Sequence, residues 1–141
     1  MKITIQTTLP VDAQTAWEYY THPVHIIKWN FASDDWCCPS AENDLRVGGT
    51  YKARMEAKDK SVGFDFEATY TEVVPGKTFT YLMEDGREVN ASFQEHDSKT
   101  TVTITFDAEK ENPEEMQKNG WQSILNNFQS YVEKSVARKQ S

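Results

Sequence analysis

The sequence contains few cysteines, and the two that are present, Cys37 and Cys38, are adjacent. A disulfide between neighbouring residues requires a strained ring, which argues against a disulfide-stapled domain of the small secreted type. Zinc sites usually separate their cysteines by two to four residues, and no second cysteine pair exists to complete a tetrahedral site. We therefore expect two reduced thiols at the edge of a core, with a redox or metal role as the open alternative.

Long hydrophobic runs and an excess of basic residues are also missing. No apolar stretch approaches the roughly 20 residues that span a bilayer, and the opening "MKITIQTTLP" lacks the apolar centre of a signal peptide. The 22 acidic residues outnumber the 15 basic ones, which gives a formal charge of −7. Nucleic-acid binders present a basic stripe, so we expect no nucleic acid, no membrane span and a soluble, cytoplasmic protein.

The first 30 residues predict one strand followed by two short helices. Residues 2–9 alternate apolar and polar side chains, which is typical of a half-buried strand. Asp12 is a suitable N-cap for a helix that ends at the "THP" of residues 21–23. A second short helix follows and ends near Trp29.

From residue 50 the hydrophobic pattern changes to a period of two, which predicts a series of strands. Apolar and polar residues alternate in five segments: 50–58, 62–71, 79–83, 89–93 and 102–106. Turn signals such as Asp85-Gly86 separate them. Successive strands with one apolar and one polar face predict an antiparallel meander that is solvated on one side.

A long C-terminal helix is predicted from Pro113 to about Arg138. Its apolar stripe is formed by Trp121, Ile124, Leu125, Phe128, Val132 and, at its end, Val136. Gly120 interrupts this helix beside a tryptophan, which we interpret as a close approach by another element. The stripe and the apolar face of the sheet must cover each other, so we expect a single α+β domain over residues 1–141.

Four segments of the chain, taken together, resemble a known family. They are "LPVDAQTAWEYYTHPVHIIKWN", "AENDLRVGGTYKARME", "GFDFEATYTEVVPGKTFTYLMEDG" and "NGWQSILNNFQSYVE". In this order they resemble the SRPBCC superfamily, and within it the group related to the C-terminal domain of the activator of heat-shock-protein-90 ATPase. The resemblance implies a START-like helix-grip fold, in which one strand, two short helices and five or six further strands form a curved antiparallel sheet that wraps a long C-terminal helix. It also implies a cavity between the two, which in relatives holds hydrophobic or amphipathic molecules.

Residues 29–47 are predicted to link the short helices to the sheet and to cross one mouth of that cavity. Trp29, Phe31 and Trp36 would then line or gate it, since aromatic side chains supply a large contact area. The alternative is that these rings fill the interior of a small domain. The acids between residues 34 and 44 are interpreted as solvated loop charges, because they lack the spacing of a calcium loop.

No segment carries a recognisable phosphate, metal or catalytic motif. The "RVGG" of residues 46–49 lacks the spacing of a dinucleotide loop and is interpreted as a backbone feature where the sheet curves. His22 and His25 have no obvious third ligand, so His25 is expected to be a polar group in the pocket instead. We predict no catalytic residue, no metal and no cofactor.

Twelve residues are predicted to line the cavity because they lie on the apolar sheet face, on the helix stripe or in the aromatic loop. They are Trp29, Phe31, Trp36, Met55, Phe64, Phe66, Tyr81, Met83, Phe93, Trp121, Leu125 and Phe128.

Three functions are compatible with this pattern. The leading hypothesis is a non-enzymatic module that binds a hydrophobic or amphipathic small molecule. The second is a co-chaperone-like protein whose partner is a chaperone or another protein. The third is a polyketide cyclase- or dehydratase-like enzyme, which requires a buried titratable residue inside the pocket.

Overall fold

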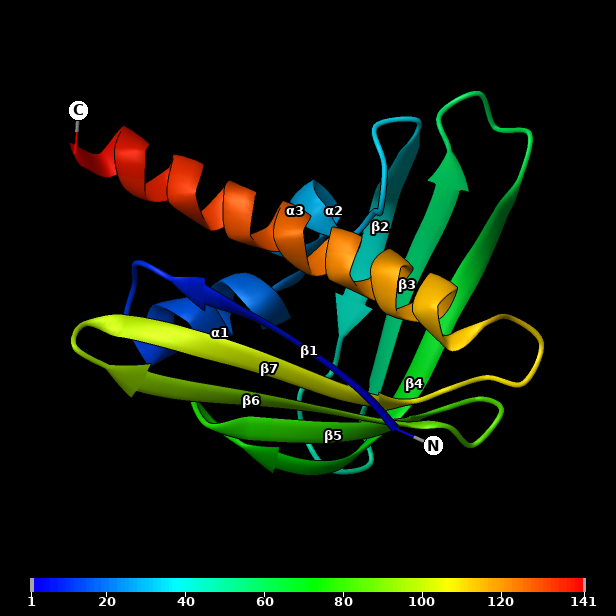
Figure 1. The fold of residues 1–141 in the computed structure, drawn as a ribbon, viewed down its shortest axis with the longest axis horizontal. Helices are drawn as coiled ribbons and strands as arrows, with labels where there is room; N and C mark the ends of the chain where they lie inside the picture. Colours follow the sequence, from blue (N-terminus) through cyan, green and yellow to red (C-terminus); the bar gives the residue numbers. More distant parts are fainter. Residues whose placement is uncertain (1, 141) are drawn as a thin grey trace.

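The computed structural model describes residues 2–140, with their side chains through residue 137. This part of the chain forms a curved sheet and three helices (Figure 1). Their bounds are β1 (Lys2–Leu9), α1 (Ala13–Thr21), α2 (Pro23–Trp29), β2 (Trp36–Asn43), β3 (Thr50–Ala57), β4 (Gly63–Val74), β5 (Thr78–Met83), β6 (Glu88–His96), β7 (Lys99–Asp107) and α3 (Glu114–Gln140).

The seven strands form one antiparallel sheet in the order β1-β7-β6-β5-β4-β3-β2. Each strand from β2 to β6 pairs with the next along the chain, and β1 pairs with β7. The first two strands in sequence therefore occupy opposite edges of the sheet, and α1 and α2 carry the chain between them. The long helix α3 crosses the concave side of this sheet (Figure 1). The predicted α+β helix-grip fold is confirmed.

Six strands follow the two short helices, within the five or six expected, but the position of one of them was not predicted. Residues 29–47 were expected to be an irregular link, but residues 36–43 form the edge strand β2, which pairs with β3. The pairing register shifts between Cys37 and Ser40, and the side chains do not alternate regularly between buried and exposed. A β-bulge of this kind interrupts the period-two pattern, so the sequence carries no clear strand signal here.

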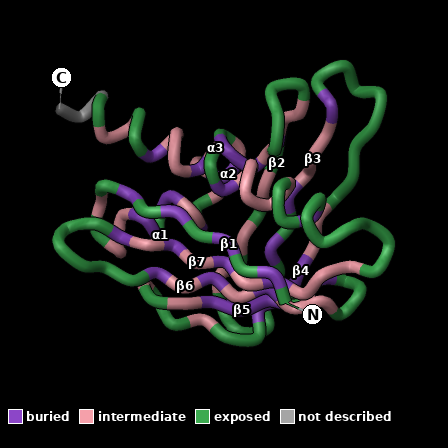
Figure 2. Tube along the Cα trace, viewed as in Figure 1, coloured by how far each residue is buried: buried purple, intermediate pink, exposed green. Residues whose placement is uncertain are grey.

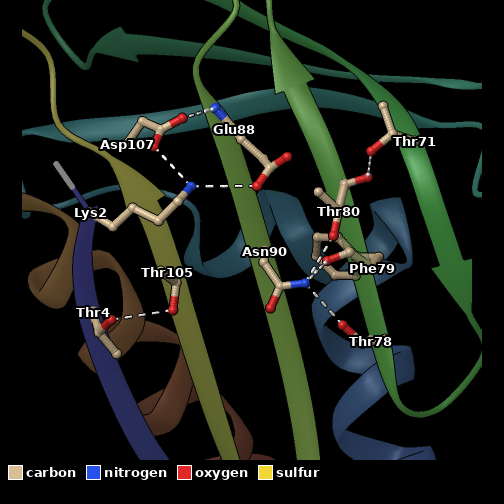
Figure 3. A network of polar contacts seen from close by, with 10 residues as sticks. All are labelled: Lys2, Thr4, Thr71, Thr78, Phe79, Thr80, Glu88, Asn90, Thr105 and Asp107. Carbon is tan, nitrogen blue, oxygen red and sulfur yellow. Dashed lines mark hydrogen bonds and ion pairs between the residues drawn. The ribbon is translucent and has the colours of Figure 1, made fainter.

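The outer face of the sheet is polar, as the alternation predicted. Lys2 Nζ lies 2.9 Å from Asp107 Oδ1 and 3.4 Å from Glu88 Oε1 (Figure 3). On the next strands, Asn90 Nδ2 donates to the hydroxyl oxygens of Thr78 and Thr80 at 3.1 and 2.9 Å (Figure 3). These cross-strand contacts bind neighbouring strands together and leave the opposite, apolar face to meet the helices.

Helix α3 is attached to the sheet at the edge strand β1 and to the end of α2. Gln129 Nε2 donates to the Thr8 carbonyl at 3.0 Å, and Asn127 Nδ2 donates to the Trp29 carbonyl at 2.9 Å. The helix therefore covers the free edge of β1, which would otherwise expose unpaired backbone groups. Gly120 was predicted to mark a close approach by another element, and this is wrong: no atom of another described element lies within 4 Å of the position that a Cβ would take.

The interior is solidly packed beneath the second half of α3. We call the side chains of Trp17, Phe93, Phe128 and Val132 the packed half. The Trp17 and Phe93 ring centroids lie 5.3 Å apart, and both Phe128 and Val132 are 0% exposed. Buried segments of the strands and helices face one another across this region (Figure 2). Edge-to-face ring packing of this kind leaves little space for another molecule.

The turn at residues 46–49 has the backbone role that the sequence predicted. Gly48 has a φ of +85°, a left-handed conformation that favours glycine. A Cβ on Gly49 would clash with the Asp44 carbonyl oxygen, so no larger residue fits. The backbone amide of Gly48 donates to the carbonyl of Tyr70, and that of Tyr70 donates to the carbonyl of Gly49. This turn therefore fixes the position of the tyrosine on β4.

Candidate ligand-binding cavity

A cavity of about 360 Å³ lies beneath the first half of α3. Its walls come from β3, β4 and β5 on the sheet and from residues 117–125 of α3. Tyr20, at the end of α1, and Trp29 and Asn30, at the end of α2, bound it on the side of the packed half. The cavity thus occupies the space between sheet and helix that α1 and α2 do not fill.

The part of the cavity nearest the solvent is apolar. Phe64 on β4 is 48% exposed, and its strand neighbour Met55 is partly buried. On the opposite wall, Trp121 stacks on Phe106 with ring centroids 4.1 Å apart and an interplanar angle of 13°. This stack holds the indole against the sheet, so Trp121 forms a wall of the cavity and does not fill it.

The inner part of the cavity is lined by four tyrosines: Tyr20 on α1, Tyr51 on β3, Tyr70 on β4 and Tyr81 on β5. The Tyr81 ring centroid lies 5.9 Å from those of both Tyr51 and Tyr70. Strand pairing produces this cluster, because Tyr70 and Tyr81 are directly opposite each other and Tyr51 faces Ala68, two residues along β4.

Burial raises the pKa of all four of these phenols above the ordinary value of 10. Smaller contributions come from neighbouring phenols: those of Tyr20, Tyr51 and Tyr70 all raise the pKa of Tyr81 further. The four hydroxyls therefore lie close enough to interact electrostatically. At neutral pH they stay protonated and can donate hydrogen bonds.

Two asparagines connect part of this tyrosine cluster to the surrounding protein. The Tyr70 hydroxyl donates to Asn43 Oδ1 at 2.7 Å, and Asn43 Nδ2 donates to the Thr21 carbonyl at 2.6 Å. Asn30 Nδ2 donates to the Tyr51 hydroxyl oxygen at 3.3 Å. Both asparagines line the cavity. Tyr51 and Tyr70 are thus held by the protein, which fixes the shape of the inner end.

Charged and polar residues at the mouth of the cavity hold the loop between β7 and α3 in place. Arg87 Nη1 lies 4.0 Å from Glu109 Oε2, and Arg87 Nε lies 2.7 Å from Asp85 Oδ2. Gln117 Oε1 accepts from the Glu109 backbone amide at 2.8 Å, and its Nε2 donates to the Glu109 carbonyl at 3.1 Å. Arg87, Glu109 and Gln117 all border the cavity. The mouth is therefore a polar rim around an apolar passage.

The structure brings together eight of the twelve residues predicted to line the cavity. They are Trp29, Met55, Phe64, Phe66, Tyr81, Met83, Trp121 and Leu125. Whether they bind a ligand remains a prediction.

Four of the predicted lining residues lie elsewhere, which corrects the prediction. Phe93 and Phe128 belong to the packed half, because the rings of α1 and α2 cover them. Trp36 lies on the edge strand β2, with its ring centroid 6.1 Å from that of Phe64. Phe31 borders a shallow polar hollow on the surface beside Ser123 and Asn127 of α3.

His25 also lies outside the cavity lining, which corrects its predicted role as a polar pocket group. Its Nδ1 is 2.7 Å from the Tyr131 hydroxyl, and its ring centroid is 4.4 Å from that of Tyr19. The histidine therefore joins α2 to α3. Sequence spacing placed it one helical turn from Trp29, but Trp29 and His25 point to different neighbours.

The two cysteines are free thiols. Cys38 is buried, and Asn30 Nδ2 lies 3.9 Å from its sulfur. Burial raises the pKa of this thiol, which keeps it protonated and lowers its reactivity. Among the residues that the structure describes, no group of three or more histidines, cysteines and acids is placed to hold a metal ion.

Sequence reasoning missed the polar character of the inner cavity. Tyr51 and Tyr70 lie on the apolar strand faces that the alternation identified, in register with Met55 and Phe66. That alternation could have placed both hydroxyls in the interior, where a phenol usually finds a hydrogen-bond partner. The asparagines gave no such signal, because each follows a helix or ends a strand.

Within residues 2–140, no helix is both long enough and apolar enough to cross a membrane.

Comparison with known proteins identifies the family. The family model for "Activator of Hsp90 ATPase homolog 1-like protein" matches residues 10–133. An AHSA1-like protein from Aeromonas hydrophila is 41% identical, with 96% of this chain and 94% of that chain covered and a TM-score of 0.91. A protein from Cytophaga hutchinsonii is also 41% identical over 96% and 94% of the two chains, with a TM-score of 0.82.

The fold extends to more distant proteins. The Aha1 dimer from Colwellia psychrerythraea is 16% identical over 94% of this chain and 96% of that chain, with a TM-score of 0.70. No match was found among curated proteins. The family model and the two 41%-identical structures together show that this chain belongs to the Activator of Hsp90 ATPase homolog 1-like family of the SRPBCC superfamily.

Proposed function

We propose that this chain binds a small hydrophobic or amphipathic molecule in the cavity between α3 and strands β3 to β5. The observation that carries the proposal is the cavity of about 360 Å³, which falls in the range of small-molecule sites. An empty apolar cavity destabilises a fold, because the side chains that line the cavity lose dispersion contacts. A bound molecule would restore those contacts.

The size of the cavity limits the ligand. An engineered cavity of about 150 Å³ is sufficient to bind benzene. The cavity here has more than twice that volume, which suits two fused or linked rings, or an acyl chain of moderate length. The exposed Phe64 provides an apolar entry route between α3 and the sheet, and the charged pair of Arg87 and Glu109 borders it.

A titration with fatty acids, flavonoids and aromatic ketones tests the proposal. Trp29 and Trp121 line the cavity, so binding is expected to change tryptophan fluorescence saturably and to broaden the NMR lines of the ligand. The blocking variant Ile124→Trp places a larger side chain in the cavity wall and should abolish binding.

The matched control is Lys118→Trp, which adds the same ring at an exposed position of α3 and should leave binding intact. Both variants add a tryptophan, so the NMR signal of the ligand is the readout for this pair. Two results would overturn the proposal: no saturable change with any compound, or equal binding by wild type and Ile124→Trp.

Interaction with a chaperone is the second candidate function. Val62 and Met116, which neighbour the cavity residues Phe64 and Gln117 in sequence, are 56% and 62% exposed. Exposed apolar side chains are typical of interaction sites, and the family is named for activators of the Hsp90 ATPase. This candidate predicts a changed ATPase rate when the protein is added to an Hsp90-type chaperone, and an unchanged rate would count against it.

The third hypothesis, a cyclase-like enzyme, has less support. It required a buried titratable residue inside the pocket, such as His25 or an inward glutamate. His25 lies outside the lining, Glu109 lies beside Arg87 at the mouth, and the tyrosine phenols act as donors at neutral pH. The cytoplasmic location likewise stays a prediction from the sequence.

A further inference from the structure

The lining of the cavity changes from apolar to phenolic along each of three neighbouring strands. On β4, Phe64 lies at the exposed end and Tyr70 lies six residues further in, about 20 Å along an extended strand. On β3 the corresponding pair is Met55 and Tyr51, and on β5 Met83 is followed inward by Tyr81. An amphipathic ligand that enters from the apolar end would therefore place the group that enters first beside the tyrosine hydroxyls.

Two of the four cavity phenols have no hydrogen-bond partner within the described part of the chain. Tyr51 and Tyr70 are bonded to Asn30 and Asn43, whereas Tyr20 and Tyr81 make no hydrogen bond there. Every fully buried side-chain nitrogen or oxygen described has a partner. The Tyr20 and Tyr81 hydroxyls therefore face the hollow space, where they can donate to a ligand.

Formal charge is confined to the other end of the cavity. The charged side chains among the described cavity residues are Arg87 and Glu109, which lie together at the mouth. A carboxylate at the tyrosine end would lose its hydration without gaining a counter-ion, which is costly in a buried site. A neutral oxygen acceptor such as a ketone carbonyl has a much smaller desolvation cost and can accept both phenolic protons.

We propose that the ligand is an aromatic or alkyl carbonyl compound that binds with its neutral carbonyl oxygen between the Tyr20 and Tyr81 hydroxyls and its apolar body against Phe66 and Trp121. This rests on the proposed function, since it requires the cavity to take a ligand. It adds the chemical class of the ligand and its direction of entry. Tyr51 and Tyr70, held by their asparagines, act as fixed walls of the acceptor site.

Three naphthalenes of matched shape test this inference. They are 2-acetylnaphthalene, 2-ethylnaphthalene and 2-naphthoate, which carry a ketone, a hydrocarbon and a carboxylate on the same two rings. Wild type is expected to bind the ketone and the hydrocarbon, and to bind the naphthoate more weakly at pH 7. Naphthoate as tight as the ketone would overturn the assignment of a neutral head group.

The double variant Tyr20→Phe with Tyr81→Phe removes the two hydroxyls that make no hydrogen bond to the described chain and keeps both rings. Its affinity for 2-acetylnaphthalene should fall about tenfold, while that for 2-ethylnaphthalene stays unchanged. The control Tyr131→Phe removes a hydroxyl outside the cavity and should alter neither affinity. An unchanged ratio of ketone to hydrocarbon affinity in the double variant would overturn the inference.

The outcomes separate this inference from the proposed function. If neither the ketone nor the hydrocarbon binds wild type, the proposed function fails and the inference fails with it. If both bind but the tyrosines do not discriminate, the proposed function stands and only the inference falls. Should the double variant not fold, the carbonyl ¹³C shift of labelled 2-acetylnaphthalene bound to wild type decides. A downfield, hydrogen-bonded shift supports the inference, and a shift like that in hydrocarbon solvent contradicts it.

Discussion

The two halves of α3 cover interiors of different kinds. In the second half, Phe128 and Val132 are 0% exposed and pack against rings from α1 and α2. In the first half, Trp121, Ile124 and Leu125 line the cavity of about 360 Å³. The same helix and the same sheet thus enclose solid core at one end and hollow space at the other.

The difference follows from where the two short helices lie. Tyr20 at the end of α1 and Trp29 at the end of α2 reach between the sheet and α3, and their ring centroids lie 5.1 and 5.0 Å from that of Phe128. Beyond these rings, the space between α3 and strands β3 to β5 is the cavity. The curvature of the sheet therefore creates the space beneath α3, and the rings at the ends of α1 and α2 set how much of that space is filled.

Truncation of a large side chain in each half should show the largest difference. Phe128→Ala leaves a new void in the packed half and is expected to lower the free energy of unfolding by about 4 kcal/mol. Leu125→Ala only enlarges space that already exists, so we expect a loss near 2 kcal/mol. Urea denaturation measures both, and equal losses would contradict the distinction between the halves.

Alkaline pH should destabilise the protein through the four tyrosines that line the cavity. Burial raises the pKa of Tyr20, Tyr51, Tyr70 and Tyr81 in the folded state, whereas the unfolded chain has the ordinary value near 10. Their stabilising effect is complete below pH 10 and is lost as the pH rises towards the folded-state pKa, by roughly 1.4 kcal/mol per pH unit for each tyrosine.

Phenolate absorbance and circular dichroism, followed together, check this prediction. The four cavity tyrosines should ionise only as the protein unfolds. A smooth titration of all phenols near pH 10 with the fold intact would contradict their burial.

Enlarging a side chain should also distinguish the two ends of α3, because added volume fits at the cavity and does not fit in the packed half. Val132→Phe adds volume where none is free and is expected to cost about 1–3 kcal/mol. Ile124→Phe, two turns earlier on the same helix, adds volume to the cavity wall and should change the stability by less than about 1 kcal/mol. Thermal denaturation compares the two variants, and a larger loss for Ile124→Phe would show that the cavity is filled.

Hydroxyl removal gives the smallest expected effect. Tyr131→Phe deletes the hydroxyl that lies 2.7 Å from His25 Nδ1 and should cost about 1 kcal/mol. Tyr81→Phe deletes a hydroxyl without a hydrogen bond to the described chain, so the stability should be nearly unchanged. Chemical denaturation of the two variants tests this order, which a larger loss for Tyr81→Phe would reverse.

Much of the fold could be predicted from the sequence because its signals are local. The period-two segments from residue 50 correspond to β3 through β7, and the helical stripe through Trp121 and Phe128 corresponds to α3. The strand β2 was missed, since its bulge near Ser40 disrupts the alternation on which a strand prediction depends. A local pattern predicts an element only where the element is regular.

The division of the interior into packed and hollow halves could not be predicted in this way. Phe66 and Phe93 occupy equivalent inward positions on their strands, but Trp17 of α1 covers Phe93, whereas Phe66 lines the cavity. Similarly, Leu125 and Phe128 share one helical stripe and lie on opposite sides of the boundary. Which residues line the cavity depends on contacts between distant segments, which hydrophobic periodicity does not contain.

Xenon binding under pressure tests whether the space beneath the first half of α3 is hollow. Xenon enters apolar cavities of sufficient size and reports them by its strong X-ray scattering. We expect a xenon site in crystals of the protein between Trp121 and Leu125 of α3 and Met55 and Met83 of the sheet. A map that shows no xenon in this space, with the ring of Phe66 or Trp121 occupying it instead, would contradict the account.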